Sequence, residues 1–366
     1  MKLLIEKSIF LESLSLASHF TSGKTISSLV LQGILLRVED ESLHLYASNL
    51  SSFFHTVIKT GKKMAEKAEV VIEPRKIIEF ISLLPEGKIN VEIKEKQIMI
   101  WSGENKGVFP LMSQTDFPFP PVVRDKEEKI EVGELRKAIF FTYFCAATDE
   151  ARPALTGIDI IPGDETLLVA TDGFRLSLAR IEKNLKIPKS IIPAEFLLEI
   201  FKHVKEEKET SFSYSLIEKV ILFRIGQNEF YSRLIDGDAP PFEKVIPTER
   251  KTKITLNRED FLRKIKIVSV FARDLSNIVI VEITKEGVIL KPKTDKTEEA
   301  SSMLEAQIEG ENQRIAFNYK FLLDFLNHVE TKNIEVEILR SDAPVIFRPV
   351  GEKKLLHIIM PVRIQE

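Results

Sequence analysis

The segments KIIEFI (Lys76–Ile81), FLLEIF (Phe196–Phe201) and FLLDFL (Phe321–Leu326) share one pattern: two apolar residues, an acid and two more apolar residues. Apolar residues on both sides of a single acid are typical of an amphipathic helix. The three acids are spaced by 120 and then 125 residues. This spacing is much longer than the roughly 20 to 50 residues of a solenoid unit, so it indicates three tandem copies of a whole domain.

Another helix and a pair of strands precede each of these segments, and a second pair of strands follows it. The opening helices are predicted at Ser8–Phe20, Val132–Ala147 and Arg258–Ala272, the last with Asn257 as its N-cap. Alternating apolar residues predict strands at Ser28–Val38, Leu43–Ala47, Ile89–Ile93, Gln97–Trp101, Gly157–Ile161, Leu167–Thr171, Ser211–Ser215, Val220–Ile225, Ile278–Ile283, Val288–Lys293, Ile334–Ile338 and Val345–Pro349. The order helix, strands, helix, strands occurs three times, which predicts an α+β fold.

Proline-rich segments mark the ends of copies one and two. DFPFPP (Asp116–Pro121) and DAPPFEKVIP (Asp238–Pro247) occupy matching places in the two copies. Proline cannot donate a hydrogen bond to a sheet, so each segment should end a sheet and lead out of a domain. We therefore predict three domains, at residues 1–124, 125–250 and 251–366.

The composition predicts an ordinary globular protein of the cytoplasm. Hydrophobic residues make up 44% and charged residues 29% of the chain, and the net charge of −3 argues against a protein that clings tightly to nucleic acid. The longest apolar stretch, Ala138–Ala147, is too short to span a bilayer. Glu6 and Lys7 lie where a signal peptide needs an apolar run. The single cysteine, Cys145, cannot form an internal disulfide, which favours a reducing compartment.

Signatures of catalysis and of metal binding are missing. Gly23-Lys24-Thr25 resembles the end of a phosphate-binding loop, but Ser18 stands where that loop needs a glycine. The acids Asp172, Asp236 and Asp238 lie in turn-like contexts, where a short acid commonly bonds its own backbone. The six histidines are scattered without the spacing of metal ligands: His19, His44, His55, His203, His328 and His357. We therefore expect no catalytic residue, no cofactor and no metal.

Three segments stand out from this background. LLVATDGFRLSLAR (Leu167–Arg180) places Asp172-Gly173 between two apolar strands, a hairpin signal in which both turn residues would have positive φ. Phe174 and Arg175 follow at once, where side chains are easily presented to a partner. The other two segments are YSRLIDGDAPPFEKVIP (Tyr231–Pro247) and the C-terminal Leu355–Glu366, which contains Met360-Pro361.

Together these segments resemble the signature segments of the bacterial beta sliding clamps, the processivity factors of the DNA polymerase III holoenzyme. ATDGFRL, LIDGDAPPFEKVIP and a terminal MPVRI occur in that order in a three-copy chain, so the resemblance covers the whole sequence. It implies a non-catalytic homodimer, joined head to tail into a six-domain ring with helices lining the hole. Such a ring encircles double-stranded DNA without sequence specificity and tethers the replicative DNA polymerase during DNA replication.

Simple geometry agrees with two chains rather than one. A domain of this length is roughly 35 Å across, so three in a closed ring leave a hole of only about 5 Å. Six leave a hole of about 35 Å, wider than a duplex of about 20 Å. Retention on DNA would then be topological, and the ring could slide because its charge does not hold it in place.

The resemblance also implies a pocket between copies two and three for short peptides of the polymerase, clamp loader and repair proteins. Carried onto this sequence, the pocket comprises Leu155, Thr171, Gly173, Phe174, Arg175, Leu176, Pro240, Lys244, Val245, Pro344, Val345, Ile358, Ile359, Met360, Pro361, Val362, Arg363 and Ile364. Phe174 stands where relatives often have His or Tyr, and Lys244 where Arg is common. Lysine lacks the bidentate fork of arginine, so peptide preference should differ.

DNA contacts and the subunit interface follow from the same resemblance. Basic residues expected near the hole are Lys24, Arg75, Lys76, Arg136, Lys137, Arg152, Lys202, Arg263, Lys264 and Lys266, of which Lys24, Arg75 and Arg152 carry over best. Asp149, Pro153 and Ala154 replace the polar and aromatic residues that flank Arg152 in relatives. Phe109 of one chain should face Val270 and Phe271 of the other, although core packing within each copy also explains these three residues.

Two other functions are compatible with a three-copy chain. One is an enzyme with Asp172 and its neighbours as catalytic acids, which a nucleotidyl-transfer assay would detect. The other is a protein-interaction scaffold that never encloses DNA, which solution mass and a loading assay would distinguish.

Overall fold

The computed structural model describes residues 1–23, 28–61, 67–113, 116–124, 126–203, 209–273, 276–293 and 300–363. These residues form antiparallel sheets with helices packed on them, so the α+β class is confirmed. The chain divides into two compact units, Met1–Val132 with Glu199–Leu234, and Gly133–Leu198 with Ile235–Glu366. Among the helices that the structure describes, none has the length and apolar character needed to cross a membrane.

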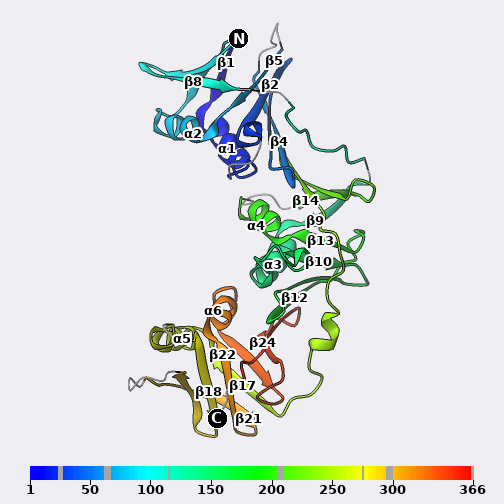
Figure 1. Cartoon of the computed structure of the whole chain (residues 1–366), viewed down its shortest axis with the longest axis vertical. Coiled ribbons are helices and arrows are strands. Elements are labelled where there is room, and N and C mark those ends of the chain that lie inside the picture. The colour runs from blue at the N-terminus through cyan, green and yellow to red at the C-terminus, as the bar shows by residue number, and fades with distance from the viewer. Residues whose placement is uncertain are drawn as a thin grey trace. The chain divides into compact units, whose positions relative to one another are not determined.

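The first unit is built on one twelve-stranded sheet, whose order is β1-β6-β7-β8-β5-β2-β3-β4-β16-β15-β14-β9. Helices α1 (Lys7–Ser18) and α2 (Pro74–Leu83) lie side by side, and α1 packs on strands β1 to β4 (Figure 1). The strands are β1 (Lys2–Glu6), β2 (Ile34–Glu39), β3 (Ser42–Ser48), β4 (Ser52–Lys59), β5 (Ala68–Ile72), β6 (Lys88–Ile93), β7 (Gln97–Ser102), β8 (Asn105–Met112), β9 (Glu128–Glu131), β14 (Glu209–Ser215), β15 (Val220–Ile225) and β16 (Asn228–Arg233).

The second unit contains a nine-stranded sheet, β13-β10-β11-β12-β25-β24-β23-β17-β21, and a four-stranded sheet, β20-β19-β18-β22. Its helices are α3 (Val132–Thr142), α5 (Arg258–Ala272) and α6 (Tyr319–Asn327), while α4 (Ala194–His203) contributes to both units. The strands are β10 (Gly157–Ile161), β11 (Thr166–Thr171), β12 (Arg175–Ile181), β13 (Ser190–Pro193), β17 (Thr252–Asn257), β18 (Ile278–Thr284), β19 (Gly287–Pro292), β20 (Ser302–Leu304), β21 (Ala306–Gly310), β22 (Gln313–Asn318), β23 (Asn333–Ile338), β24 (Val345–Pro349) and β25 (Leu355–Ile359).

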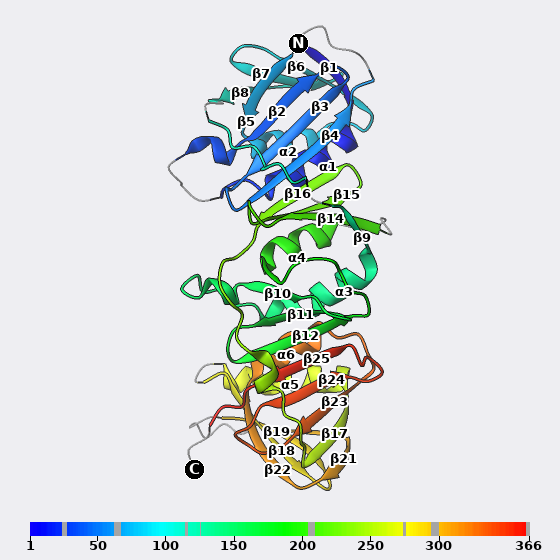
Figure 2. The ribbon, with the colours of Figure 1, turned by 90° about the vertical axis from the view of Figure 1, so that its right-hand side faces the viewer.

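Both large sheets run across the predicted copies. Strand β4 pairs with β16, with Phe54 opposite Phe230, and β12 pairs with β25, with Ser177 opposite His357. Figure 2 shows β12, β25, β24 and β23 in succession. Copy two is therefore shared between the two units, and the boundaries at 124 and 250 stay a prediction.

The repeated helices form where they were predicted, for identifiable local reasons. In α2, Pro74 occupies the first turn and the Glu73 carboxylate accepts the backbone N–H of Arg75 at 3.1 Å. In α5, the Asn257 Oδ1 accepts the N–H of Asp260 at 3.0 Å, which confirms the predicted N-cap. The strands form where apolar residues alternate with polar ones. In β6, for example, only Ile89, Val91 and Ile93 are buried, because alternate side chains face the core.

Two predicted elements are shorter than expected. The strand expected at Ser28–Val38 begins only at Ile34, because Leu29–Gln32 forms a 3-10 turn whose Val30 and Leu31 enter the core. The helix expected at Val132–Ala147 ends at Thr142, whose hydroxyl donates to the Ala138 carbonyl at 2.8 Å. A 3-10 turn, Tyr143–Cys145, follows it.

Cys145 belongs to the core of the second unit. Its thiol is buried and donates to the Ser177 hydroxyl at 3.2 Å. Burial raises the pKa of this thiol to about 12. A thiol that stays protonated and inaccessible acts as a small apolar side chain rather than a nucleophile.

Candidate functional site

The hairpin between β11 and β12 presents an aromatic side chain. The Asp172 Oδ1 accepts the backbone N–H groups of Phe174 at 2.9 Å and of Arg175 at 3.0 Å, so this acid fixes the turn as expected. The strands pair Thr171 with Leu176, which places Gly173 and Phe174 at the turn. Of these turn residues only Gly173 has positive φ, +93°, so the prediction of positive φ at both Asp172 and Gly173 was wrong. Phe174 is 61% exposed.

Arg175 is engaged within its own chain. Its Nε donates to the Asp172 Oδ2 at 3.0 Å, and its Nη1 pairs with the Asp324 carboxylate of α6. The guanidinium carbon also lies 4.6 Å from the centre of the Phe321 ring. Arg175 therefore holds the hairpin against α6, and it supports the exposed turn rather than offering its charge to a ligand.

The C-terminal segment continues from β25 along the hairpin. The Met360 N–H donates to the Phe174 carbonyl at 2.8 Å, and the Val362 N–H donates to the Ala316 carbonyl at 2.8 Å. These bonds fix the backbone of Met360–Arg363 and leave the Met360 side chain half-buried beside Phe174. The predicted Ile364 lies outside the described residues.

The predicted pocket residues separate by depth. Leu176, Val345, Ile358 and Ile359 are at most 3% exposed, so they lie in the core and do not offer a contact surface. The half-buried members are Leu155, Thr171, Arg175, Pro344, Met360, Pro361 and Val362, and the exposed members are Gly173, Phe174, Pro240, Lys244, Val245 and Arg363. The surface that a partner can touch is thus narrower than the predicted set.

A small hollow lies beside this surface, and three of the predicted residues line it: Leu155, Thr171 and Pro240. Further lining residues were missed from the sequence: Ala154, Gly157, Asp159, Val169, Ala170, Ala239 and Phe242. Of these, Asp159 was detectable as the one acid within the apolar strand GIDII. Its side chain is 4% exposed, and Oδ1 has no hydrogen-bond partner among the described residues. Burial raises the pKa of this carboxyl to about 6.

Asp159→Asn should stabilise the protein more at pH 7.5 than at pH 5. The folded-state pKa of about 6 exceeds the ordinary value of 3.8, so folding favours the protonated carboxyl. The contribution of Asp159 to stability therefore falls as pH rises through this window, by about 1–3 kcal/mol in all. Thermal unfolding of both proteins at the two pH values measures the difference, with the exposed Asp164→Asn as control. An equal effect of Asp159→Asn at both values would contradict it.

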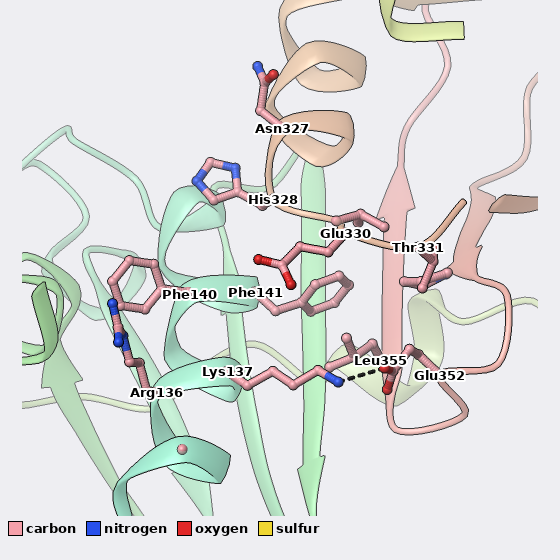
Figure 3. Close-up of a pocket in the computed structure, with 13 residues that line it drawn as sticks. Arg136, Lys137, Phe140, Phe141, Asn327, His328, Glu330, Thr331, Glu352 and Leu355 are labelled. Carbon is pink, nitrogen blue, oxygen red and sulfur yellow. Dashed lines mark hydrogen bonds and ion pairs between the residues drawn. The ribbon is translucent and has the colours of Figure 1, made fainter. Parts of the chain in front are cut away.

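A larger groove of about 810 Å³ lies between α3 and the segment after α6 (Figure 3). Two predicted DNA contacts, Arg136 and Lys137, line it from α3. The Lys137 Nζ pairs with the Glu352 Oε1 at 2.6 Å, and the Arg136 guanidinium lies 5.3 Å from the Phe140 ring centre. The groove thus has an aromatic wall and a rim of mixed charge, because Glu330 and Glu352 line it together with Arg136 and Lys137.

The other predicted DNA contacts differ in how free their charges are. Among the described residues, no ion pair engages Arg75, Lys76, Arg152, Lys202 or Lys266, all of which are exposed. On α5, Arg263 and Lys264 both pair with Asp260. Lys24 lies outside the described residues. The basic residues come from several helices and loops of both units.

The predicted interface residues also differ in how far they are exposed. Phe109 lies 5.6 Å from the Phe80 ring, measured between centroids, so it packs partly within its own copy. Val270 is 48% exposed on α5, and Phe271 is half-buried.

Comparisons with known proteins extend over the whole chain. Family models for the N-terminal, central and C-terminal domains of the DNA polymerase III beta subunit match residues 1–121, 129–241 and 243–363. A beta sliding clamp of Staphylococcus aureus is 27% identical over 376 residues, which cover 99% of each chain. Similar solved structures include the DNA polymerase III beta subunit from Thermotoga maritima, at 25% identity and a TM-score of 0.92, and the DNA polymerase sliding clamp from Bacillus subtilis, at 26% identity and a TM-score of 0.90; both matches cover 100% of each chain. The chain therefore belongs to the family of DNA polymerase III beta subunits, the sliding clamps that act in DNA replication as non-catalytic processivity factors.

Proposed function

We propose that two copies of this chain close head to tail into a ring around duplex DNA in the cytoplasm. The ring tethers the replicative polymerase and receives short peptides of the polymerase, clamp loader and repair proteins beside Phe174 and Met360. The observation that carries the ring is a pair of exposed apolar patches, one in each unit, which have no partner among the described residues.

The patch of the first unit lies on α2 and β8. Leu83 is 80% exposed, and the half-buried Phe80, one helical turn before it, packs on Phe109 of β8 with the ring centroids 5.6 Å apart. The nearby acids Glu79, Glu86 and Glu104 are exposed as well. This patch is therefore apolar and has acids on its rim, of which Glu86 is paired with Lys7.

The patch of the second unit lies on α5. Ile267 and Val270, one helical turn apart, are 49% and 48% exposed. Arg263 and Lys266 line the same shallow surface. Apolar centres with rims of opposite charge suit each other, and contact between two different patches is head to tail by definition. Our proposed interface therefore includes Val270 and also Leu83 and Ile267, which the sequence interpretation did not name.

Light scattering should give about twice 41.8 kDa for the native chain and a monomer for Val270→Asp at micromolar concentration. The aspartate places an unpaired charge in an apolar contact that faces acidic residues. Ile217→Asp is the matched control, because Ile217 is 92% exposed but lies in the turn between β14 and β15. A monomeric native chain at tens of micromolar would contradict the proposed ring.

The peptide site rests on the half-buried Met360 beside the exposed Phe174. Both are apolar, and methionine adapts to partners of different shape. The exposed Lys244 and Arg363 near this surface add positive charge that suits acidic peptides. The exposed Arg75, Lys76, Arg152, Lys202 and Lys266 are the preferred candidates for contacts with DNA phosphates.

A further inference from the structure

Three potential metal ligands converge in the first unit, where helices α1 and α4 end. The His19 Nδ1 lies 3.1 Å and the His203 Nε2 2.9 Å from the same oxygen, the Glu199 Oε1. One ligand atom from each of the three side chains lies within 4.8 Å of the other two. Sequence spacing gives no sign of this convergence, because the fold brings together residues 180 positions apart.

The donor set is that of a zinc-type site. Two imidazoles and one carboxylate suit a borderline divalent cation, and ligand bonds near 2.0–2.1 Å place tetrahedral donors roughly 3.3 Å apart. The two nitrogen–oxygen distances of 3.1 and 2.9 Å differ from this spacing by a few tenths of an ångström, and the two histidine nitrogens lie within 4.8 Å of each other, a separation that side-chain rotation can adjust. The side chains of His19 and His203 are 46% and 43% exposed, which leaves the remaining coordination position open to water.

The backbone around the site also favours a cation. His19 is the residue that follows α1, and His203 is the last residue of α4. Both helices therefore point their carbonyl ends, the negative ends of their dipoles, toward the three side chains. Among the described residues, no lysine or arginine pairs with Glu199, and its partners there are the two histidines.

The corresponding place in the second unit has a different arrangement. The residues 124 or 125 positions further along are Tyr143, Asp324 and His328. There the Tyr143 hydroxyl bonds the His328 Nε2 at 2.8 Å, the His328 Nδ1 lies 2.7 Å from the Asp324 carbonyl, and the Asp324 carboxylate pairs with Arg175. The side chains at these repeat-related positions thus already bond to other protein groups, so they serve as an internal comparison for the three side chains of the first unit.

We propose that His19, Glu199 and His203 bind one divalent transition-metal ion of the zinc type. The ion would join the end of α1, in copy one, to the end of α4, in copy two. It would reinforce the junction that the β4–β16 pairing already makes within the first unit.

Isothermal titration of the chelator-treated full chain with Zn²⁺ tests the site. We expect one ion per chain with micromolar or tighter affinity, and His19→Gln and His203→Gln should each weaken it by at least about tenfold. His328→Gln is the matched control, because it removes the repeat-related histidine and leaves all three donors. Bound Zn²⁺ should also raise the melting temperature of the native chain and of His328→Gln, but not of the two donor variants.

A second measurement keeps the test decisive if a donor variant folds poorly. Co²⁺ bound to the native chain should give visible absorption typical of a tetrahedral site, and Glu199→Gln should weaken it while keeping a side chain that can hydrogen-bond both histidines. Absence of Zn²⁺ uptake at roughly 100 µM would overturn the proposal. So would binding that is unchanged in both histidine variants, since the three side chains would then form only hydrogen-bonded His–Glu pairs.

Discussion

Clamps loaded on a nicked DNA circle should survive a salt wash that strips them from the same DNA after it is cut to a linear form. The net charge of −3 and the dispersed basic residues predict weak equilibrium affinity for duplex, which weakens further as salt rises. On a circle the ring leaves only by opening an interface, whereas on linear DNA it slides off an end. We expect dissociation from the circle to be slower by at least about 100-fold, since salt acts on phosphate contacts and not on topology.

Variants separate topology from charge in this assay. Lys76→Ala and Lys202→Ala each remove one exposed cation and should leave retention on circles nearly unchanged, whereas Val270→Asp should abolish it by opening the proposed interface. Ile217→Asp again serves as the control for an added charge. Equal release from circular and linear DNA would show that the chain does not enclose the duplex.

Met360→Asp should weaken binding of a short peptide with two apolar anchors by about 10- to 100-fold or more. Loss of one buried apolar contact costs about 1.5–3 kcal/mol, and the introduced carboxylate adds a desolvation penalty. Micromolar affinity corresponds to roughly −8 kcal/mol, so the variant should bind only in the high micromolar to millimolar range. Fluorescence polarisation with a labelled peptide measures the change.

The fold should tolerate this substitution. Met360 is only half-buried, and it is fixed through its backbone N–H, which donates to the Phe174 carbonyl at 2.8 Å. Any residue other than proline keeps this N–H donor. The dimer mass of Met360→Asp should equal that of the native chain. Native affinity in a folded Met360→Asp protein would mean that the peptide binds elsewhere.

The elements that could be predicted from the sequence are those with a strong local period. The stripe in FLLDFL becomes α6, and the short apolar run VILFRI becomes β15 with the predicted bounds. Residues 28–38 were harder, because an apolar run enters the core equally well as a 3-10 turn and as a strand. The point at which the 3-10 turn gives way to β2 depends on a tertiary contact, because the backbone at Gly33 lies against Val71. A Cβ added to Gly33 would lie 2.4 Å from the Val71 side chain.

The candidate sites depended more on resemblance and on long-range pairing. The exposed Phe174 follows from a local hairpin signal, but the burial of Leu176 and Ile358 follows from the pairing of β12 with β25, which no local pattern indicates. The same limit hid the convergence of His19 with Glu199 and His203, since one partner directly follows α1 and two lie on α4. Local periodicity cannot report which helix ends will meet.

The strand pairing across copies also has a consequence for synthesis on the ribosome. The first unit ends at Leu234, so its sheet can be completed while the rest of the chain is still being made. Strand β12 (Arg175–Ile181), in contrast, receives its partner β25 only when Leu355–Ile359 emerges. At about 5–20 residues per second this wait lasts roughly 10–35 s, during which an unpaired strand edge is open to wrong partners. Nascent chains are thus most vulnerable to aggregation in the middle of translation. The emergence of β25 and Met360 ends this period of risk and also completes the proposed peptide surface.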